Sequence, residues 1–155
     1  MLDWCGRLCS LVFHDPAMIM EAIAFSLLLP LSFRFIGVQK TQARLRKWTE
    51  RYSRKPTGTD ADTVISSALR AQRAVKRMTG LEGSCLVRSL SLWAMLLRRG
   101  VHTDLRIGMR RSSNTMEGHA WLEVEGSPVN EKPAVVGTYT VFEEPLSFDQ
   151  MTRTS

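Results

Sequence analysis

The sequence predicts an α+β fold, because its apolar residues follow two different periods in two parts of the chain. Up to Gly100 they recur every three to four positions, as on a helix face, and from Val101 on they alternate with polar residues, as in half-buried strands. Helices followed by a small antiparallel sheet are typical of this class. The 155 residues fit a single domain, and a hydrophobic content of 44% is ordinary for a globular protein.

Charge is distributed unevenly along the chain, which has 21 basic and 15 acidic residues and a net charge of +6. Between residues 34 and 55, Glu50 is opposed by Arg34, Lys40, Arg44, Arg46, Lys47, Arg51, Arg54 and Lys55. Between residues 117 and 149, Lys132 is opposed by Glu117, Glu123, Glu125, Glu131, Glu143, Glu144 and Asp149. The basic segment suits nucleic acid, an anionic membrane surface or an acidic protein, and a solvated helix face is the ordinary alternative.

The three cysteines favour a reducing compartment, because their number is odd and no other secretory signal accompanies them. Cys5 and Cys9 would share one helix face, but no second pair or nearby histidine completes a zinc site, so we interpret both as structural and expect no metal. The N-terminus carries Asp3 and has neither a basic run before an apolar one nor a cleavage site. We therefore expect a cytoplasmic protein.

The stretch 16–38 is the most apolar part of the sequence. Its charge-free run extends only from Ala22 to Phe33, and Pro30 interrupts it, whereas about 20 apolar residues are needed to span a bilayer. We predict a helix that does not span a membrane. Its apolar side chains then need cover from this domain, a partner or a lipid interface, and those that we expect to be covered are Met18, Ile23, Leu27 and Phe33.

A short basic helix is predicted over residues 41–52, and the turn-rich linker 53–59 follows it. Thr59 and Asp62 resemble a capping box at the start of a second long helix, with aspartate in place of the usual glutamate. That helix should end at Gly80. Its apolar stripe consists of Val64, Ile65, Ala68, Leu69, Val75 and Met78.

The stretch 83–100 predicts a central buried helix that starts at a cysteine. Ser84 is the expected N-cap, and Arg98-Arg99-Gly100 supply a cationic last turn and a glycine stop. The apolar positions at helical spacing are Leu86, Val87, Leu90, Trp93, Ala94 and Leu97. Cys85 would lie at the positive end of the helix dipole, which favours a thiolate and makes it a candidate nucleophile. The structural alternative is a small apolar residue packed under the helix start.

Strands are predicted where apolar and polar residues alternate, at 105–110 and 119–125. The polar segment 112–117 is expected to connect them. The segment 125–128 then reads as a turn that leads to a third short strand around Val129 and Asn130.

His119 lies on the strand face opposite the apolar Ala120, so it need not be a core histidine. If the third strand pairs antiparallel across the turn, Asn130 and Glu131 fall opposite the region of His119, and a carboxylate can reach the imidazole. A cysteine at a helix start, a histidine on a strand and an acidic residue on the next strand are the three parts of a cysteine-nucleophile triad. Each part alone is a weak signal.

Two other histidines compete for the role of the base. His14 precedes the apolar helix and His102 lies at a helix-to-strand junction, and neither has an evident acidic partner in the sequence. The alternative for His119 itself is a surface or partly buried structural histidine.

Three segments together resemble the transglutaminase-like leader peptidase of lasso-peptide biosynthesis, in the short form without a leader-recognition domain. They read SCLVRSLSLWAMLLRRGVHTDLRIGMRR, GHAWLEVEGSPVNE and EAIAFSLLLPLSFRFIG. The family pattern has a cysteine-leucine-x-arginine helix start, two arginines and a glycine at the helix end, and a histidine-alanine-tryptophan strand followed by an acidic residue. The resemblance covers most of the chain.

The resemblance implies a papain/transglutaminase-like fold in which the cysteine helix packs on a small antiparallel sheet. It implies a cysteine endopeptidase that removes the leader from a ribosomally made precursor before macrolactam cyclisation. Cys85 matches the nucleophile and His119 the base, while Glu131 stands where the family usually has aspartate. Asn130 is the alternative orienter, because a side-chain amide can also hold the histidine.

Two further residues are assigned supporting roles. Arg88 lies three residues after Cys85 on the same helix and would pair with a carboxylate near the site, although a structural ion pair is an equal alternative. Trp121 belongs to the histidine-alanine-tryptophan strand motif.

The implied partners are the precursor peptide, a separate leader-recognition protein, and an ATP-using cyclase related to asparagine synthetase that takes the product. No cofactor, metal or nucleic acid is expected, and a peripheral membrane contact stays open. We expect residues 1–58 to be a helical docking segment with its linker and residues 59–155 the protease core, joined in one compact unit. Two alternatives remain: acyl or amide transfer of the transglutaminase type, and a non-catalytic peptide-binding module.

Overall fold

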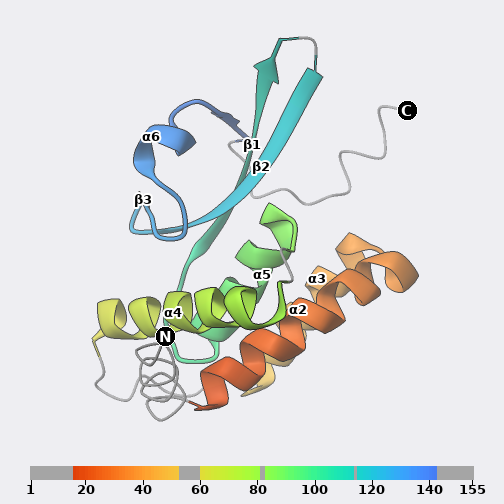
Figure 1. The fold of residues 1–155 in the computed structure, drawn as a ribbon, viewed down its shortest axis with the longest axis vertical. Coiled ribbons are helices and arrows are strands. Elements are labelled where there is room, and N and C mark those ends of the chain that lie inside the picture. The colour runs from red at the N-terminus through yellow and green to blue at the C-terminus, as the bar shows by residue number, and fades with distance from the viewer. Residues whose placement is uncertain (1–15, 53–59, 81–82, 114, 143–155) are drawn as a thin grey trace, which may run out of the picture. The chain divides into compact units, whose positions relative to one another are not determined.

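The computed structural model describes residues 16–52, 60–80, 83–113 and 115–142, and it forms two compact units (Figure 1). Residues 1–101 make the helical unit and residues 102–155 make the sheet unit, and each is described by itself. Helices followed by a four-stranded antiparallel sheet confirm the predicted α+β class. The sequence predicts a division after residue 58 into a docking segment and a protease core. That division of roles stays a prediction. Cys5, Cys9 and His14 lie outside the described residues.

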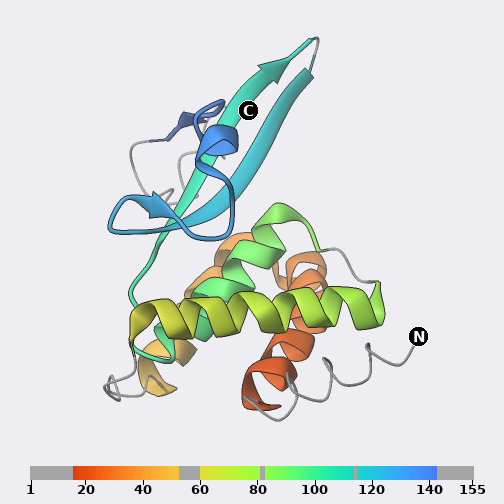
Figure 2. The ribbon, with the colours of Figure 1, turned by 60° about the vertical axis from the view of Figure 1, so that its left-hand side comes forward.

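The described part of the helical unit contains α2 (Pro16–Ile36), α3 (Val38–Tyr52), α4 (Ala61–Thr79) and α5 (Cys85–Leu97). α2 packs against the other three helices, and α5 also contacts α3 and α4. Figure 2 shows α4 running across α5. Gly37 separates α2 from α3 in a left-handed conformation with φ of 84°, which a glycine adopts without steric cost.

α5 is the central helix that the sequence predicts, and it is buried on almost every side. Its middle turns carry side chains with 2% exposure or less: Ser89, Leu90, Ser91, Leu92, Ala94, Met95 and Leu96. A helix that is buried all round obtains its stability from packing rather than from an amphipathic pattern. α5 is therefore the core of the helical unit.

α4 begins one residue later than the proposed capping box implies. Its N-cap is Asp60, whose side chain makes no capping hydrogen bond, so the Thr59–Asp62 capping box is wrong as the helix start. Because Asp62 lies within the first turn, its carboxylate still suits the positive helix end. The predicted stop is confirmed, since Gly80 adopts φ of 66° and its N–H bonds to the Lys76 carbonyl. Met78 of the predicted stripe is 44% exposed.

α2 continues through Pro30, which the sequence analysis expects to interrupt the apolar stretch. Proline lacks the N–H that would bond to the preceding turn, but packing on both sides of it, at Phe25 and Leu29 and at the half-buried Phe33, keeps the segment helical. By length and composition, α2 is the one helix of the described residues that could cross a membrane, with 22% of its apolar window buried.

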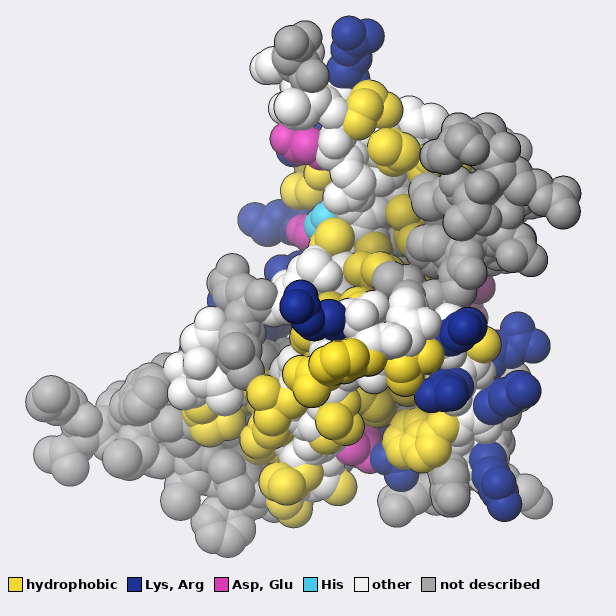
Figure 3. All heavy atoms as spheres, turned by 90° about the vertical axis from the view of Figure 1, so that its right-hand side faces the viewer, with side chains coloured by type: hydrophobic (Ala, Val, Ile, Leu, Met, Phe, Trp, Pro, Cys, Tyr) yellow, Lys and Arg dark blue, Asp and Glu magenta, His cyan; other side chains and the backbone are white. Residues whose placement is uncertain are grey.

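The side of α2 that faces away from the bundle is also apolar, and we call it the α2 outer face. It consists of Met20, Leu27, Leu28, Leu31 and Phe35, which are 49–78% exposed. Successive helix residues are 100° apart, so these positions fall within about 100° of one another, opposite the buried Met18, Ala22 and Leu29. Leu27 is not covered within the helical bundle, so its expected cover by a partner or a lipid interface stays a prediction. Figure 3 shows hydrophobic side chains gathered on this face with Lys and Arg side chains beside them.

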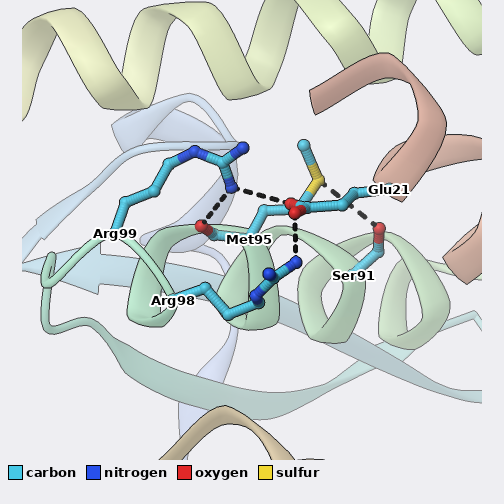
Figure 4. Close-up of polar contacts among 5 residues, drawn as sticks. All are labelled: Glu21, Ser91, Met95, Arg98 and Arg99. Atoms are coloured by element: carbon cyan, nitrogen blue, oxygen red, sulfur yellow. Dashed lines mark hydrogen bonds and ion pairs between the residues drawn. The ribbon is translucent and has the colours of Figure 1, made fainter. Parts of the chain in front are cut away.

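Glu21 connects α2 to the two arginines that directly follow α5, of which Arg98 is the C-cap (Figure 4). Its carboxylate accepts hydrogen bonds from Arg98 and from Arg99, the second at 2.7 Å, and these side chains are only 17–21% exposed. Arg99 also donates to the Met95 carbonyl at 3.0 Å, and the Arg98 guanidinium lies 4.7 Å from the ring centroid of Trp48 on α3. One acidic residue thus pairs with both arginines at the cationic end of α5, and this cluster joins three helices.

The sheet unit contains β1 (Asp104–Ser112), β2 (Thr115–Val124), β3 (Ser127–Pro128), α6 (Pro133–Val136) and β4 (Thr140–Val141). The strand order is β3-β2-β1-β4, and every described pairing is antiparallel. β1 and β2 form the long hairpin.

Two strand boundaries differ from the prediction. β2 starts at Thr115, because Ser112 pairs with Thr115 across a two-residue turn, so the predicted polar connection is mostly strand. β3 starts at Ser127 rather than around Val129, because Glu125 and Gly126 both have positive φ and close a two-residue turn that places Ser127 opposite Val124. In both cases tight turns leave more residues for pairing.

We expect Glu21→Gln to destabilise the helical unit by about 2 kcal/mol, because the amide leaves two half-buried arginines without a counter-charge. Urea unfolding followed by far-UV circular dichroism measures the change. Glu125→Gln, in an exposed turn, is the matched control and should change stability by less than about 0.5 kcal/mol. Equal losses in both variants would contradict a special role for Glu21.

Candidate active site

Cys85 is the first residue of α5, and its thiol is free and half-buried. Ser84 is the N-cap as predicted, because its Oγ accepts a hydrogen bond from the Val87 N–H at 3.3 Å. Gly83 has no room for a side chain, since an added Cβ would lie 2.7 Å from Cγ1 of Val87. The chain therefore enters the helix tightly, with the cysteine at the turn where backbone N–H groups are unpaired.

His119 lies on β2 and is paired with Gly108 of β1. Its Nε2 is 3.0 Å from Oε2 of Glu131, and the two side chains are 16% and 21% exposed. Because an ionised carboxylate only accepts hydrogen bonds, Nε2 is the donor, which leaves Nδ1 as the ring nitrogen that can take up a proton. The sequence-based expectation that a carboxylate reaches this imidazole agrees with this contact. The catalytic roles of both residues stay predictions.

Asn130, the alternative orienter, makes a different described contact. Its Oδ1 accepts a hydrogen bond from the Leu122 N–H at 2.7 Å, and the neighbouring Val129 N–H bonds to the Leu122 carbonyl at 2.9 Å. These two bonds extend the pairing of β2 beyond β3. Asn130 thereby holds the segment that carries Glu131 against β2.

The β2 face that carries His119 is not the open polar face that alternation predicts. Trp121 lies on this face and is fully buried, with its Nε1 donating to Oε1 of Glu123 at 2.8 Å. Arg106 on β1 donates to Oε2 of the same carboxylate at 3.0 Å. Both faces of β2 are therefore covered at this point.

Tyr139 is the residue near His119 that sequence reasoning missed. Its ring is stacked with the imidazole at a centroid distance of 5.2 Å and an interplanar angle of 25°. Trp121 is 6.1 Å from the imidazole and 6.3 Å from Tyr139, so the three rings form a triangular cluster. Tyr139 lies 20 positions after His119, and no periodic signal in the sequence relates the two.

Arg110 lies beside this ring cluster. Its guanidinium carbon is 4.8 Å from the Tyr139 centroid, within range of a cation–π contact, and its Nε donates to Oε2 of Glu117 at 2.9 Å. The hydrogen bond from Arg110, with one from Ser112, holds the pKa of the Glu117 carboxyl below its usual range. The same bond raises the pKa of Arg110.

Two other predicted site residues, Arg88 and Cys85, belong to the helical unit. Arg88 is exposed on α5, and its backbone carbonyl accepts a hydrogen bond from Gln72 Nε2 at 2.9 Å, so its pairing with a carboxylate stays a prediction. His102 is exposed. Cys85 belongs to the helical unit and His119 to the sheet unit, so the approach of thiol to imidazole also stays a prediction. Within the described ranges, no cluster of three or more His, Cys, Asp or Glu side chains could hold a metal ion.

The comparisons with known proteins give one match. A family model for the transglutaminase-like superfamily matches residues 25–144, from within α2 to just beyond β4, and this is more than half of the chain. Neither a curated protein nor a solved structure matches the chain. The matched range includes the cysteine at the start of α5 and the histidine–glutamate pair of the sheet unit. The chain belongs to the transglutaminase-like superfamily.

Proposed function

We propose that this protein is a cysteine endopeptidase that removes the leader peptide from a ribosomally synthesised lasso-peptide precursor before macrolactam cyclisation. The observation that carries the proposal is the 3.0 Å contact between His119 Nε2 and Glu131, made in a transglutaminase-like chain whose Cys85 starts a helix. Membership of this superfamily points to cysteine-protease or transferase chemistry. The motif resemblance described above supports the leader peptidase among these.

In the first half of the reaction, Cys85 gives its proton to His119 and its sulfur attacks the carbonyl carbon at the leader–core junction. The charge that develops on the carbonyl oxygen is stabilised by the Cys85 backbone N–H at the positive helix end. His119 then donates the proton to the amine nitrogen as the C–N bond breaks. The core peptide leaves with a free amine, and the leader stays attached as a thioester.

In the second half, His119 takes a proton from a water molecule whose oxygen attacks the thioester carbon. The C–S bond breaks, the proton returns to the Cys85 sulfur, and the leader leaves as a free carboxylic acid. Glu131 accepts the Nε2–H bond throughout, so it keeps the tautomer that presents Nδ1 and stabilises the imidazolium. Neither a cofactor nor a metal takes part in these steps.

The substrate reaches the enzyme on a partner under this proposal. A separate leader-recognition protein binds the precursor and docks on the α2 outer face, where five apolar side chains are 49–78% exposed. α2 is held in the bundle by its buried side and by Glu21, which favours a surface contact over insertion across a bilayer. Arg34 is an exposed cation on α2 itself, and α3, which packs on α2, carries the exposed Lys40, Arg44, Lys47 and Arg51. These cations suit a partner with an acidic rim. An anionic lipid surface is the competing occupant.

The freed core peptide passes to an ATP-using cyclase related to asparagine synthetase, and the reaction takes place in the cytoplasm. Nucleic acid has no part in it. The competing activity is acyl transfer to an amine, since the same thioester accepts any nucleophile that reaches it. Mass analysis of the leader distinguishes the two reactions, because hydrolysis gives the free acid and transfer gives an amide.

Cys85→Ala should abolish cleavage and leave the fold intact, because it removes the sulfur nucleophile from a half-buried position. The variant is incubated with precursor and recognition protein, and product mass is followed over time. The double variant Cys5→Ala/Cys9→Ala is the matched control and should cleave at the wild-type rate. Cleavage by Cys85→Ala at that rate would end the cysteine-protease proposal.

Glu131→Gln should lower turnover by a factor on the order of 10² to 10⁴, because a neutral amide no longer stabilises the imidazolium. Asn130→Ala should lower turnover less but reduce thermal stability, since it leaves the Leu122 N–H without its acceptor. Steady-state kinetics and melting temperature are measured on both variants. If Asn130→Ala lowered turnover more than Glu131→Gln, Asn130 would be the residue that orients His119.

Cleavage of full-length precursor should depend steeply on the recognition protein, because delivery on a bound partner can raise apparent affinity by roughly 10² to 10⁴. Initial rates at sub-saturating precursor are compared with and without it. Leu27→Ser/Leu31→Ser on the α2 outer face should remove most of this dependence.

Met78→Ser/Met116→Ser, which changes two equally exposed apolar side chains elsewhere, is the control and should keep the dependence. Equal rates with and without the recognition protein would show that this chain reads its substrate unaided. If the α2 variants keep the dependence but lose binding to anionic vesicles, the outer face belongs to a lipid surface instead.

A further inference from the structure

We propose that Tyr139 is a positioning residue that holds the His119 imidazole in the orientation in which Nε2 faces Glu131 and Nδ1 faces the substrate side. The inference rests on the proposed function for its kinetic consequences. Its structural content rests on the packing around His119 alone. All the residues involved belong to the sheet unit.

One hydrogen bond is not sufficient to fix an imidazole ring. The contact between Nε2 and Glu131 restrains one edge of the ring, while rotation about the Cβ–Cγ bond is broad for histidine and can turn Nε2 away from the carboxylate, so that no acceptor selects the Nε2–H tautomer. A second restraint on the face of the ring removes this freedom. Tyr139 supplies it, because its ring is stacked with the imidazole at 5.2 Å and an angle of 25°.

Gly108 makes this close packing of Tyr139 possible. It lies in the middle of β1, paired with His119 on one side and with Val141 of β4 on the other. A Cβ at this position would lie 2.9 Å from Cβ of Tyr139 and 3.0 Å from Cη2 of Trp121. Glycine inside a strand weakens the strand. At position 108 the glycine is explained by the ring cluster, which packs directly over the backbone.

Tyr139 is itself held in place by other groups. Arg110, two residues after Gly108 on the same strand, puts its guanidinium 4.8 Å from the ring centroid, and Glu117 and Thr138 in turn bond to that guanidinium. The backbone of Thr140, the next residue, pairs with Met109. The ring is therefore restrained by the strand that begins one residue later and by a paired cation, which is what a positioning residue requires.

The test separates ring orientation from catalysis. In the full-length enzyme, the imidazole nitrogens are observed by ¹⁵N NMR, with His119→Gln used to assign them. Wild type should show one tautomer with the proton on Nε2. Tyr139→Leu should give a mixture of both tautomers, and Tyr139→Phe, which keeps the ring, should restore the wild-type spectrum.

Gly108→Ala should reproduce the effect of Tyr139→Leu, because the added methyl group displaces the Tyr139 ring. Phe142→Leu removes an aromatic ring of the same sheet unit at a 36% exposed position, and it should leave the spectrum unchanged. A single Nε2–H tautomer in both Tyr139→Leu and Gly108→Ala would overturn the proposal, whatever the activity of the protein.

The kinetic arm then tests the consequence for the proposed reaction. Tyr139→Leu should lower kcat by roughly 10- to 100-fold with little change in KM, as expected when a catalytic group is misoriented but substrate binding is kept. Tyr139→Phe should stay within about twofold of wild type. A loss that appears only in KM would assign Tyr139 to substrate binding and overturn the positioning role. If wild type cleaves nothing, the proposed function fails, while the spectra still decide the orientation of His119.

Discussion

The burial of most of α5 is the constraint on which the helical unit depends. Its middle residues have almost no exposed surface, so three other helices must surround it, and only its two ends can carry polar chemistry. At one end, Glu21 forms ion pairs with Arg98 and Arg99. At the other, Ser84 caps the helix and Cys85 stays half-buried. A nucleophile on a rigid buried helix keeps its geometry better than one on a loop.

In the sheet unit, the corresponding constraint is that the His119 imidazole is held by several neighbours. Three neighbours restrain His119: Glu131 at Nε2, and the rings of Tyr139 and Trp121. Each arrives from a different stretch of the chain, and the missing side chain of Gly108 lets the rings come together. The glycine at position 108 weakens β1 locally, and the packing of the ring cluster over it offsets this loss.

The exposure of the α2 outer face, like the burial of α5, is set by how the four described helices pack together. A helix with two apolar faces can bury only one of them in its own bundle, and α2 uses Met18, Ala22 and Leu29 for this. The opposite side stays exposed, and it is the surface on which we propose that the recognition protein docks.

Local patterns were sufficient for the helices, their glycine stops, the capped cysteine of α5 and the long hairpin. Period, caps and turn residues act over a few positions and can be read directly. Alternation also placed Glu131 near His119, because a tight turn at Glu125 and Gly126 leaves little choice of register. The capping box at Thr59 failed because a cap depends on backbone geometry at one residue.

Only the tertiary structure revealed the contacts that join distant segments. Glu21 lies 77 positions from Arg98, and Tyr139, whose ring stacks on His119, lies 20 positions after it, between α6 and β4. The continuity of α2 through Pro30 likewise depends on neighbours in other helices. Sequence by itself determined the class, the long helices, the hairpin and the candidate nucleophile, base and acid, because these follow from short-range order, whereas it did not predict α6 and β4. The ring cluster and the ion-pair junction were decided by packing, since their partners are set by how whole elements meet rather than by any local spacing.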